Sequence, residues 1–490
     1  MSQAKAVKNL PQQILLGLSL LFLTLYFLFF LYRSFHETFF PYSIDYHEPY
    51  LLGLVKLIVA GEDLYRDPNS PPYILPFYGP GYLWLVATLS RLFGTFYAVG
   101  RVISFASALF IGLVTFLVLR RETKSILTST TATFLFFSTY VVYSFSPDYR
   151  VDFLGVALAF GGMYLLYRKL NSTTIFLSSL LLTFALFTKG PEIAAPVAAF
   201  IYIFLKKKTS GLQFGFTFAF LVLTIFFGLN YLTQGEFFFH NITVPLTFPT
   251  DVERLFKELY RLIIVHPVLL ALALAYFIRQ DWRKEAAIFS FWLIPNLVVT
   301  LRTTAVLAVG PNHFIELMAL LCILFGLSFH HLWQLTLRTP QHAILSLLVP
   351  SLLLFQALSL FHAPNLPSRI QEQYFFYLYT PPSPYSQRAQ ERERVLSSIN
   401  AAQRPVLSLD GHFTEGDADK EVEFGPDNNF IYLVSRGYWD PEPLQGKIRN
   451  KEYGLIISRR GGFWQLGMNM EDYYYVSDTT ANYWLWKPKE

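Results

Sequence analysis

The stretch PYSIDYHEPYLLGLVKLIVAGEDLYRDPNSPPYILPFYGPGYLWLVATLSRLFG, from Pro41 to Gly94, follows the first membrane-length apolar segment, Ile14–Tyr32. Close to where the chain leaves the bilayer it carries Asp45, His47 and Glu48. A solvated loop at a helix end would explain such a cluster. However, the stretch is rich in Tyr, Phe, Pro and Leu, and residues 50–60 and 80–93 are patterned as two amphipathic helices lying on the membrane. We therefore favour a lid over a site at the membrane face.

The composition is typical of a polytopic membrane protein. Of 490 residues, 53% are hydrophobic and 15% are charged, which is less charge than a soluble domain carries. Aromatic residues make up 18%, as expected where many helices meet lipid. The net charge of +5 comes from loop lysines and arginines, so it does not indicate nucleic-acid binding. With Cys322 as the only cysteine, an intramolecular disulfide is excluded.

Apolar length and loop charge predict about eleven spans and their orientation. The predicted spans are 14–32, 97–119, 126–145, 152–167, 174–188, 191–205, 213–232, 262–278, 285–300, 312–332 and 342–361. The basic clusters then fall on one side, which we take as cytoplasmic together with the N-terminus. The first outer loop, 33–96, lies on the other side. We expect a multi-pass protein of the plasma (inner) membrane.

Residues 80–93 are apolar enough to be taken for a span. If they crossed the membrane, Arg120, Arg121 and every later basic cluster would lie outside, so we predict a helix on the outer leaflet instead. The spans 174–188 and 191–205 are short. We expect them to form a hairpin whose tip, 188–191, dips towards the membrane face.

The chain changes character at about residue 363. We divide it into a transmembrane module, 1–362, and a small extracytoplasmic α/β domain, 363–490. The transmembrane module is predicted to be a mainly α, helical bundle. Within the second domain we predict a helix at 387–400, buried strands at 405–410 and 454–458, and a closing hairpin from 473–477 and 482–487. No catalytic motif is evident there, and a passive cap is the expected role.

The acids of the outer side are candidates for chemistry. Asp45 and Glu48 share a face if their segment is helical, and a carboxylate in a membrane-bounded cleft can act as a general base. With His47 they could also hold a divalent metal, although one short cluster is a weak metal signal. For Asp148 we favour a charge network at a helix end. Asp152 begins an apolar run and is expected to point into a cleft.

Lys189 is the strongest single candidate for a contact with a lipid phosphate. It stands in a tight Gly-Pro turn between two apolar segments, in LFTKGPEIAAP, where an ammonium can meet a lipid phosphate. A lysine snorkelling at a helix end fits the spacing equally well. Arg302, His313 and Glu316 could line the same cleft, whereas we expect Asn312 to cap its helix.

Several short motifs occur in an order that resembles a known superfamily. They are Gly61-Glu62-Asp63-Leu64-Tyr65, Pro71-Pro72, Tyr78-Gly79-Pro80-Gly81-Tyr82, Arg91-Leu92-Phe93-Gly94, Gly100-Arg101-Val102-Ile103-Ser104, Phe187-Thr188-Lys189-Gly190 and Asn312-His313-x-x-Glu316, with Asp152 heading a span. This order resembles the GT-C superfamily of integral membrane glycosyltransferases, and in particular the branch of bacterial lipid A aminoarabinose transferases and relatives of protein O-mannosyltransferases. The resemblance covers about residues 10–360 and, more loosely, the C-terminal domain.

The resemblance implies a fold of many transmembrane helices, a sugar donor carried on a polyprenyl phosphate, and inversion at the anomeric carbon. It places the acceptor base on Asp45, the second outer acid on Asp152 and a phosphate contact on Lys189. Tyr65 and Arg66 join the candidate substrate contacts. Many members carry the second acid directly beside the first, but here two residues separate Asp45 from Glu48, which leaves the role of Glu48 and a metal requirement open.

The sequence thus predicts a glycosyltransferase of the cell envelope that moves a hexosyl or pentosyl group from a polyprenyl-phosphate donor to a glycan, lipid or protein acceptor. No cofactor is certain and a divalent metal is possible. The alternative is a transporter or flippase of lipid-linked sugars, which should show repeated halves and charges buried in mid-span. A structural or assembly factor would not need acids and a lysine converging at one membrane face.

Overall fold

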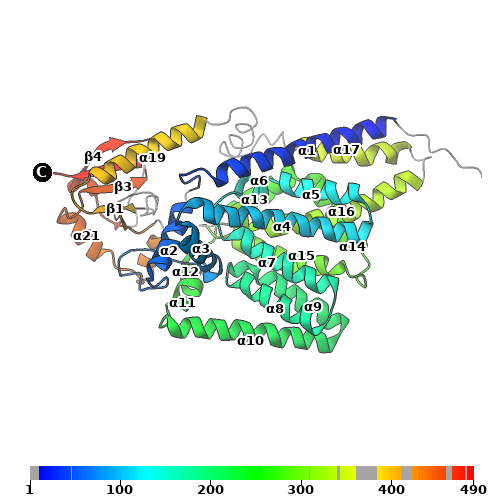
Figure 1. Cartoon of the computed structure of the whole chain (residues 1–490), viewed down its shortest axis with the longest axis horizontal. Coiled ribbons are helices and arrows are strands. Elements are labelled where there is room, and N and C mark those ends of the chain that lie inside the picture. The colour runs from blue at the N-terminus through cyan, green and yellow to red at the C-terminus, as the bar shows by residue number, and fades with distance from the viewer. Residues whose placement is uncertain are drawn as a thin grey trace, which may run out of the picture.

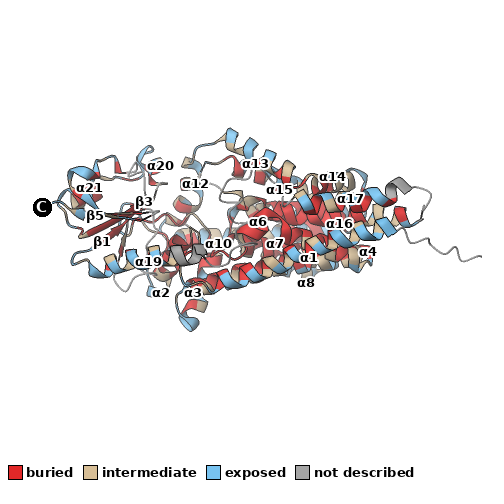
Figure 2. Ribbon diagram, turned by 90° about the horizontal axis from the view of Figure 1, so that it is seen from above, coloured by how far each residue is buried: buried red, intermediate tan, exposed pale blue. Residues whose placement is uncertain are grey.

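The computed structural model describes residues 10–45, 47–307, 310–338, 343–359, 383–409, 422–427, 429–459, 466–480 and 483–490. Its helices run side by side as an elongated bundle, with a smaller α/β domain at one end (Figure 1). Buried residues are concentrated along the middle of the bundle, and exposed residues cover the outer helix faces (Figure 2).

The bundle is built from helices that correspond to the predicted apolar segments. They are α1 (Leu10–Thr38), α4 (Tyr97–Thr123), α5 (Ile126–Ser138), α6 (Tyr140–Phe145), α7 (Asp152–Arg168), α8 (Ser172–Leu186), α9 (Ala194–Lys206), α10 (Lys208–Leu232), α13 (Val252–Val265), α14 (Pro267–Arg279), α15 (Ala287–Thr304), α16 (Ile315–Arg338) and α17 (Ala343–Ser359). Short helical turns link them: η1 (Gly190–Ile193), α11 (Glu236–Phe238), η2 (Phe239–Thr243), α12 (Val244–Thr247) and η3 (Pro311–Phe314).

Five helices of the described chain are long and apolar enough to cross a membrane, or six if the bent pair α13–α14 counts as one span. The protein is therefore a multi-pass membrane protein. Every predicted segment coincides with a described helix or helix pair, but several of these helices, such as α5 and α8, are shorter than a full span. The number eleven stays a prediction.

The pair α13–α14 bends by 92° where His266 meets Pro267. Proline supplies no backbone N–H and disfavours a helical conformation in the residue before it, so one helix ends and another begins here. In α13 the side chains of Phe256 and Tyr260 are 65% and 57% exposed. Exposed aromatic side chains of this kind are typical of an amphipathic helix at the membrane interface.

The first outer loop contains the two predicted helices, α2 (Glu48–Ala60) and α3 (Pro80–Phe93). Each has a proline in its first turn and ends at a glycine with positive φ, Gly61 at 82° and Gly94 at 95°. Both helices lie between the bundle and the α/β domain (Figure 1). The face of α3 that carries Leu92 and Phe93 is exposed, as expected of a helix on the outer leaflet.

The α/β domain contains a five-stranded sheet of order β2-β1-β3-β5-β4. Its strands are β1 (Val406–Ser408), β2 (Val422–Phe424), β3 (Leu455–Arg459), β4 (Tyr474–Thr479) and β5 (Tyr483–Pro488), with helices α19 (Ser383–Ala401), α20 (Phe430–Val434) and α21 (Glu442–Arg449) and the turn η6 (Met470–Asp472). The three strands β2, β1 and β3 are parallel, whereas β5 and β4 form an antiparallel hairpin. The predicted helix, buried strands and hairpin are confirmed, and β2 was not predicted. The predicted domain boundary at 362–363 lies outside the described residues.

The α/β domain and the first outer loop share one hydrophobic core. Tyr73 and Leu75 of the loop are buried with Leu407, Phe430 and Trp439 of the domain. Beside this core, the backbone N–H of Asp440 donates a hydrogen bond of 2.9 Å to the Asn69 side chain. The first outer loop therefore lies between the helical bundle and the α/β domain and packs against both.

Candidate active site

Three separate loops bring charged side chains together at the end of the bundle that faces the α/β domain. Asp45 follows α1, Arg150 and Asp152 stand at the start of α7, and Lys189 follows α8. Arg150 bridges the two acids, with 3.2 Å to Asp45 Oδ1 and 3.0 Å to Asp152 Oδ2. The Lys189 ammonium lies 2.5 Å from Asp152 Oδ1. The structure thus connects Asp45 to Lys189 through two side chains.

The acids of this group differ in how far they are buried. The side chain of Asp152 is 3% exposed and that of Lys189 is 5% exposed, whereas Asp45 is 19% exposed. Asp152 also accepts a hydrogen bond of 2.7 Å from the Asn312 amide. Asp152 is therefore held by three partners, and Asp45 keeps the more accessible carboxylate.

The turn that carries Lys189 is packed directly against the Tyr-Gly-Pro-Gly-Tyr motif of the first outer loop. Gly81 N–H donates a hydrogen bond of 2.9 Å to the Phe187 carbonyl. A Cβ atom at Gly79 would lie 2.0 Å from that same oxygen, and one at Gly81 would lie 2.4 Å from Thr188 Oγ1. Only glycine allows this approach. The motif therefore fixes the loop onto the lysine turn.

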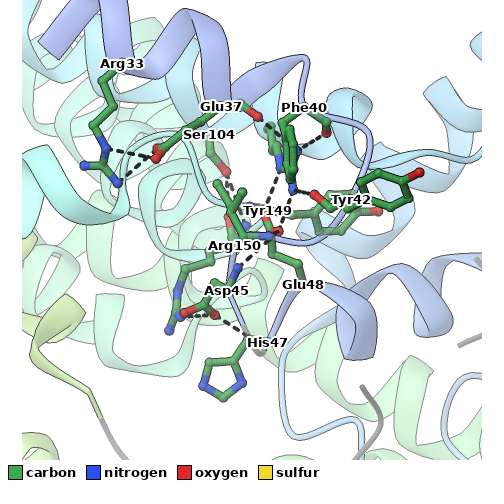
Figure 3. A network of polar contacts seen from close by, with 12 residues as sticks. Arg33, Glu37, Phe40, Tyr42, Asp45, His47, Glu48, Ser104, Tyr149 and Arg150 are labelled. Carbon is green, nitrogen blue, oxygen red and sulfur yellow. Dashed lines mark hydrogen bonds and ion pairs between the residues drawn. The ribbon is translucent and has the colours of Figure 1, made fainter. Parts of the chain in front are cut away.

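The side chain of Glu48 is more deeply buried than that of Asp45. Its carboxylate forms two hydrogen bonds with Arg101, of 2.8 and 2.6 Å, and accepts further hydrogen bonds from the backbone N–H groups of Ile44 and Tyr149. Arg101 in turn donates to the carbonyl oxygens of Glu37, Phe40 and Tyr42 (Figure 3). Both side chains are fully buried. Glu48 thus anchors the root of the loop on α4.

Next to this anchor a second ion pair joins Arg33 and Glu37 of α1 at 3.0 Å (Figure 3). Arg33 also donates hydrogen bonds to the backbone carbonyl groups of Tyr143 and Ser144. Asp148 is also buried in this region, with 5% exposure. Burial, together with the nearby charges of Asp45 and Glu48, holds the pKa of Asp148 well above its usual range. Asp148 therefore lies buried among the charged groups at this end of the bundle.

A small pocket opens beside Lys189, between α7, α15 and α16. It is lined by Val156, Lys189, Pro191, Glu192, Asn296, Val299, Thr300, Thr303, Asn312, His313 and Glu316. Gly155 of α7 makes room for it, since a Cβ atom there would lie 3.2 Å from Glu192 Cγ and 3.4 Å from Lys189 Cβ. The candidate residues His313 and Glu316 therefore share one wall with Lys189.

The other candidate residues lie elsewhere. Arg302 is exposed near the end of α15 and is not among the residues that line the pocket. Tyr65 is buried and donates 2.8 Å to the Tyr78 carbonyl, which ties the loop to the glycine motif. Arg66 pairs with Glu62 at 2.9 Å. These contacts give Tyr65 and Arg66 a place in the loop's own structure.

One sequence expectation is wrong. Asn312 does not cap its helix: its amide nitrogen donates to Asp152, and its oxygen accepts no hydrogen bond from the described residues. The reason is that Asp152, far away in sequence, lies within reach and offers a charged acceptor, which binds the amide more strongly than a neutral group.

Sequence reasoning also missed residues of the pocket. Glu192 and Asn296 were not proposed, and Arg150 was not expected to bridge two acids. Glu192 carried a usable signal, because a carboxylate two residues into a predicted span must face the protein interior. Asn296 lies in mid-helix without a motif, and only the fold brings it to the pocket.

The arrangement does not favour a metal centre. Within the described parts of the chain, no group of three or more His, Cys, Asp or Glu side chains is placed to hold a metal ion. Asp45 and Asp152 are already paired with Arg150, and a cation would have to displace the guanidinium. We therefore derive no step through a metal.

The fold can also be compared with those of known proteins. No protein-family model and no curated protein sequence matches the chain. ArnT from Cupriavidus metallidurans bound to undecaprenyl phosphate matches it with a TM-score of 0.61 and 10% identity, over 96% of this chain and 98% of that one. The chain has the GT-C fold.

Two further solved structures also match the fold of this chain. ArnT in the apo state gives a TM-score of 0.60 at 11% identity, over 96% of this chain and 97% of that one. The oligosaccharyltransferase of Archaeoglobus fulgidus, tethered with an acceptor peptide, gives 0.51 at 12% identity, over 95% of this chain and 74% of that one. The GT-C fold thus covers both the helical bundle and the α/β domain of the present chain, which the resemblance in sequence included more loosely.

Proposed function

We propose that this GT-C protein transfers a sugar from a polyprenyl-phosphate donor to a hydroxyl-bearing acceptor on the side of the membrane where the α/β domain lies, which we assign as extracytoplasmic. The observation that carries the proposal is the chain of contacts from Asp45 through Arg150 and Asp152 to Lys189. It places an accessible carboxylate and a buried cation at one membrane face, as transfer from a lipid phosphate requires.

The donor side is assigned to Lys189. A lipid-phosphate ligand is named for one protein of the same fold, undecaprenyl phosphate for ArnT. The ammonium of Lys189 lies in the wall of a pocket and can stabilise the charge that grows on the leaving phosphate. Asp152 orients the ammonium, and Asn312 and Arg150 hold Asp152.

The acceptor side is assigned to Asp45. Its carboxylate takes the proton of the acceptor hydroxyl while that oxygen bonds to the anomeric carbon and the bond from this carbon to the phosphate breaks. Because acceptor and phosphate stand on opposite sides of the anomeric carbon, the transfer inverts its configuration. The first outer loop covers the site and excludes water from the activated sugar. Glu48 acts as a positioning residue for this loop.

The test is transfer of radiolabelled sugar by the full-length protein in lipid nanodiscs, with a panel of polyprenyl-phosphate sugars and an envelope fraction as acceptor. Asp45→Asn is expected to lower transfer by about 100- to 10,000-fold, the usual effect of a general base. Asp63→Asn, an exposed acid of the same loop, is the matched control and is expected to keep full activity.

An Asp45→Asn protein that melts like the wild type and transfers at the wild-type rate would remove Asp45 from the mechanism. If no donor supports transfer, while the protein speeds passage of the same lipids across sealed vesicles, the glycosyltransferase assignment itself fails and the transporter takes its place.

A further inference from the structure

The pocket beside Lys189 holds more hydrogen-bond acceptors than the protein uses. Four of its buried oxygen atoms have no hydrogen-bond partner among the described residues: Glu192 Oε2, Glu316 Oε1, Asn296 Oδ1 and Asn312 Oδ1. These side chains come from η1, α16, α15 and η3, and each residue is at most 4% exposed. An unsatisfied buried polar atom costs about 1–3 kcal/mol, so four in one place need an explanation.

The composition of the pocket defines the chemistry of its ligand. The Glu192 and Glu316 carboxyl groups are close electrostatic neighbours. The one cation in the wall, Lys189, is already bound to Asp152. A group that enters must therefore donate hydrogen bonds, and it must be able to accept one where a carboxyl group carries a proton.

A sugar edge with free hydroxyl groups meets both conditions. A hydroxyl donates to a carboxylate or amide oxygen, and it can also accept if one carboxyl group carries a proton. A metal ion fits less well, since the described residues provide no group of three metal-ligating side chains. The pocket also adjoins the phosphate contact assigned above, and the donor joins sugar and phosphate through a single oxygen.

We propose that Glu192, Glu316 and Asn296 bind hydroxyl groups of the sugar that is transferred, while Asn312 divides its amide between Asp152 and the sugar. The inference rests on the proposed function and adds the substrate class. The donor carries a sugar with a free hydroxyl group that enters the pocket. A sugar that lacks the contacted hydroxyl is bound more weakly.

The experiment measures binding and transfer separately. The probes are a radiolabelled polyprenyl-phosphate hexose, its singly deoxygenated analogues, and sugar-free polyprenyl phosphate. The full-length protein in nanodiscs is compared with Glu316→Gln, Glu192→Gln and Asn296→Leu. Glu258→Gln is the matched control, because Glu258 is a buried carboxylate of α13 that pairs with Arg261 outside the pocket.

We expect the wild type to bind the best hexose lipid at least tenfold more tightly than the sugar-free lipid, and each pocket variant to lose about tenfold in binding of the hexose lipid alone. Removal of the contacted hydroxyl group should weaken binding of the lipid to the wild type about tenfold. Binding to the variant that lacks the protein partner of that hydroxyl group should weaken less than twofold. A merely structural role would not produce this coupling. The control should bind all probes as the wild type does.

Equal binding of sugar-bearing and sugar-free lipid by the wild type would overturn the inference, as would equal losses for the deoxy sugar in wild type and variants. Selective sugar binding without any transfer would leave the pocket assignment standing and refute the proposed function instead, so the two failures are distinguishable.

Discussion

Two groups of buried charges lie within the same end of the bundle, and they differ in how completely they are satisfied. Around Glu48 and Arg101 the carboxylate oxygens are both paired and the guanidinium donates to three backbone carbonyls (Figure 3). Around Lys189 the ammonium is paired, but four neighbouring oxygens have no partner among the described residues.

The difference indicates what each group is for. A fully satisfied ion pair holds elements together and has no capacity left for a ligand. A partly satisfied group is costly to the free protein and is retained where a substrate completes it. The saturated group should therefore govern stability, and the unsaturated group should govern activity.

The largest effect on stability is expected from Arg101→Met. It removes the partner of a fully buried carboxylate, which typically costs about 3–5 kcal/mol. The thermal unfolding midpoint in nanodiscs should fall by many degrees, and activity should be lost together with the fold. Arg91→Met is the control, since Arg91 is an exposed arginine of α3 that donates to a carbonyl only. An Arg101→Met protein of wild-type stability would contradict the anchoring role.

A large effect on activity is expected from Lys189→Gln. Loss of the charge that stabilises the leaving phosphate should lower kcat/KM by about 100-fold, comparable with removal of one oxyanion donor. Asp152 keeps Arg150 and Asn312 as partners, so the unfolding midpoint should fall much less than in Arg101→Met. Lys257→Gln, at an exposed lysine, serves as control. A Lys189→Gln protein that transfers normally would exclude the phosphate contact.

The smallest effect is expected from Asp148→Asn. The raised pKa of Asp148 means that the folded protein binds its proton more tightly than the unfolded chain does. This contribution to stability is complete below the usual aspartate range, near pH 4, and is lost as pH rises through the raised pKa. Asparagine carries no such penalty, so at pH 8 the variant should be as stable as the wild type or more stable, and at pH 4 it should show no gain.

Transfer by Asp148→Asn should stay within about threefold of the wild type, because asparagine keeps the shape of the side chain and Asp148 has no assigned part in the transfer. Unfolding midpoints at both pH values and one transfer assay check the prediction. A loss of activity as large as that of Asp45→Asn would place Asp148 in the chemistry and remove the distinction between the two acids.

The local sequence determined the elements of this protein. Apolar length predicted the helices, and the amphipathic pattern of residues 50–60 and 80–93 predicted the two helices of the first outer loop, since periodicity depends on residues a few positions apart. The strand β2 was missed because Val422–Phe424 is too short to show a pattern. The converging acids and lysine were predicted from their common side of the membrane, which the loop charges fix.

The tertiary structure decided which polar groups meet. Asp45 and Glu48 look alike in sequence, and only the position of Arg101, 53 residues away, makes Glu48 a fully paired anchor and leaves Asp45 accessible. Asn312 meets Asp152 across 160 residues, and Glu192 and Asn296 join Glu316 in one pocket. Hydrogen bonds and charge pairs act over a few ångströms in space, and no local pattern records which distant segments the fold brings to that distance.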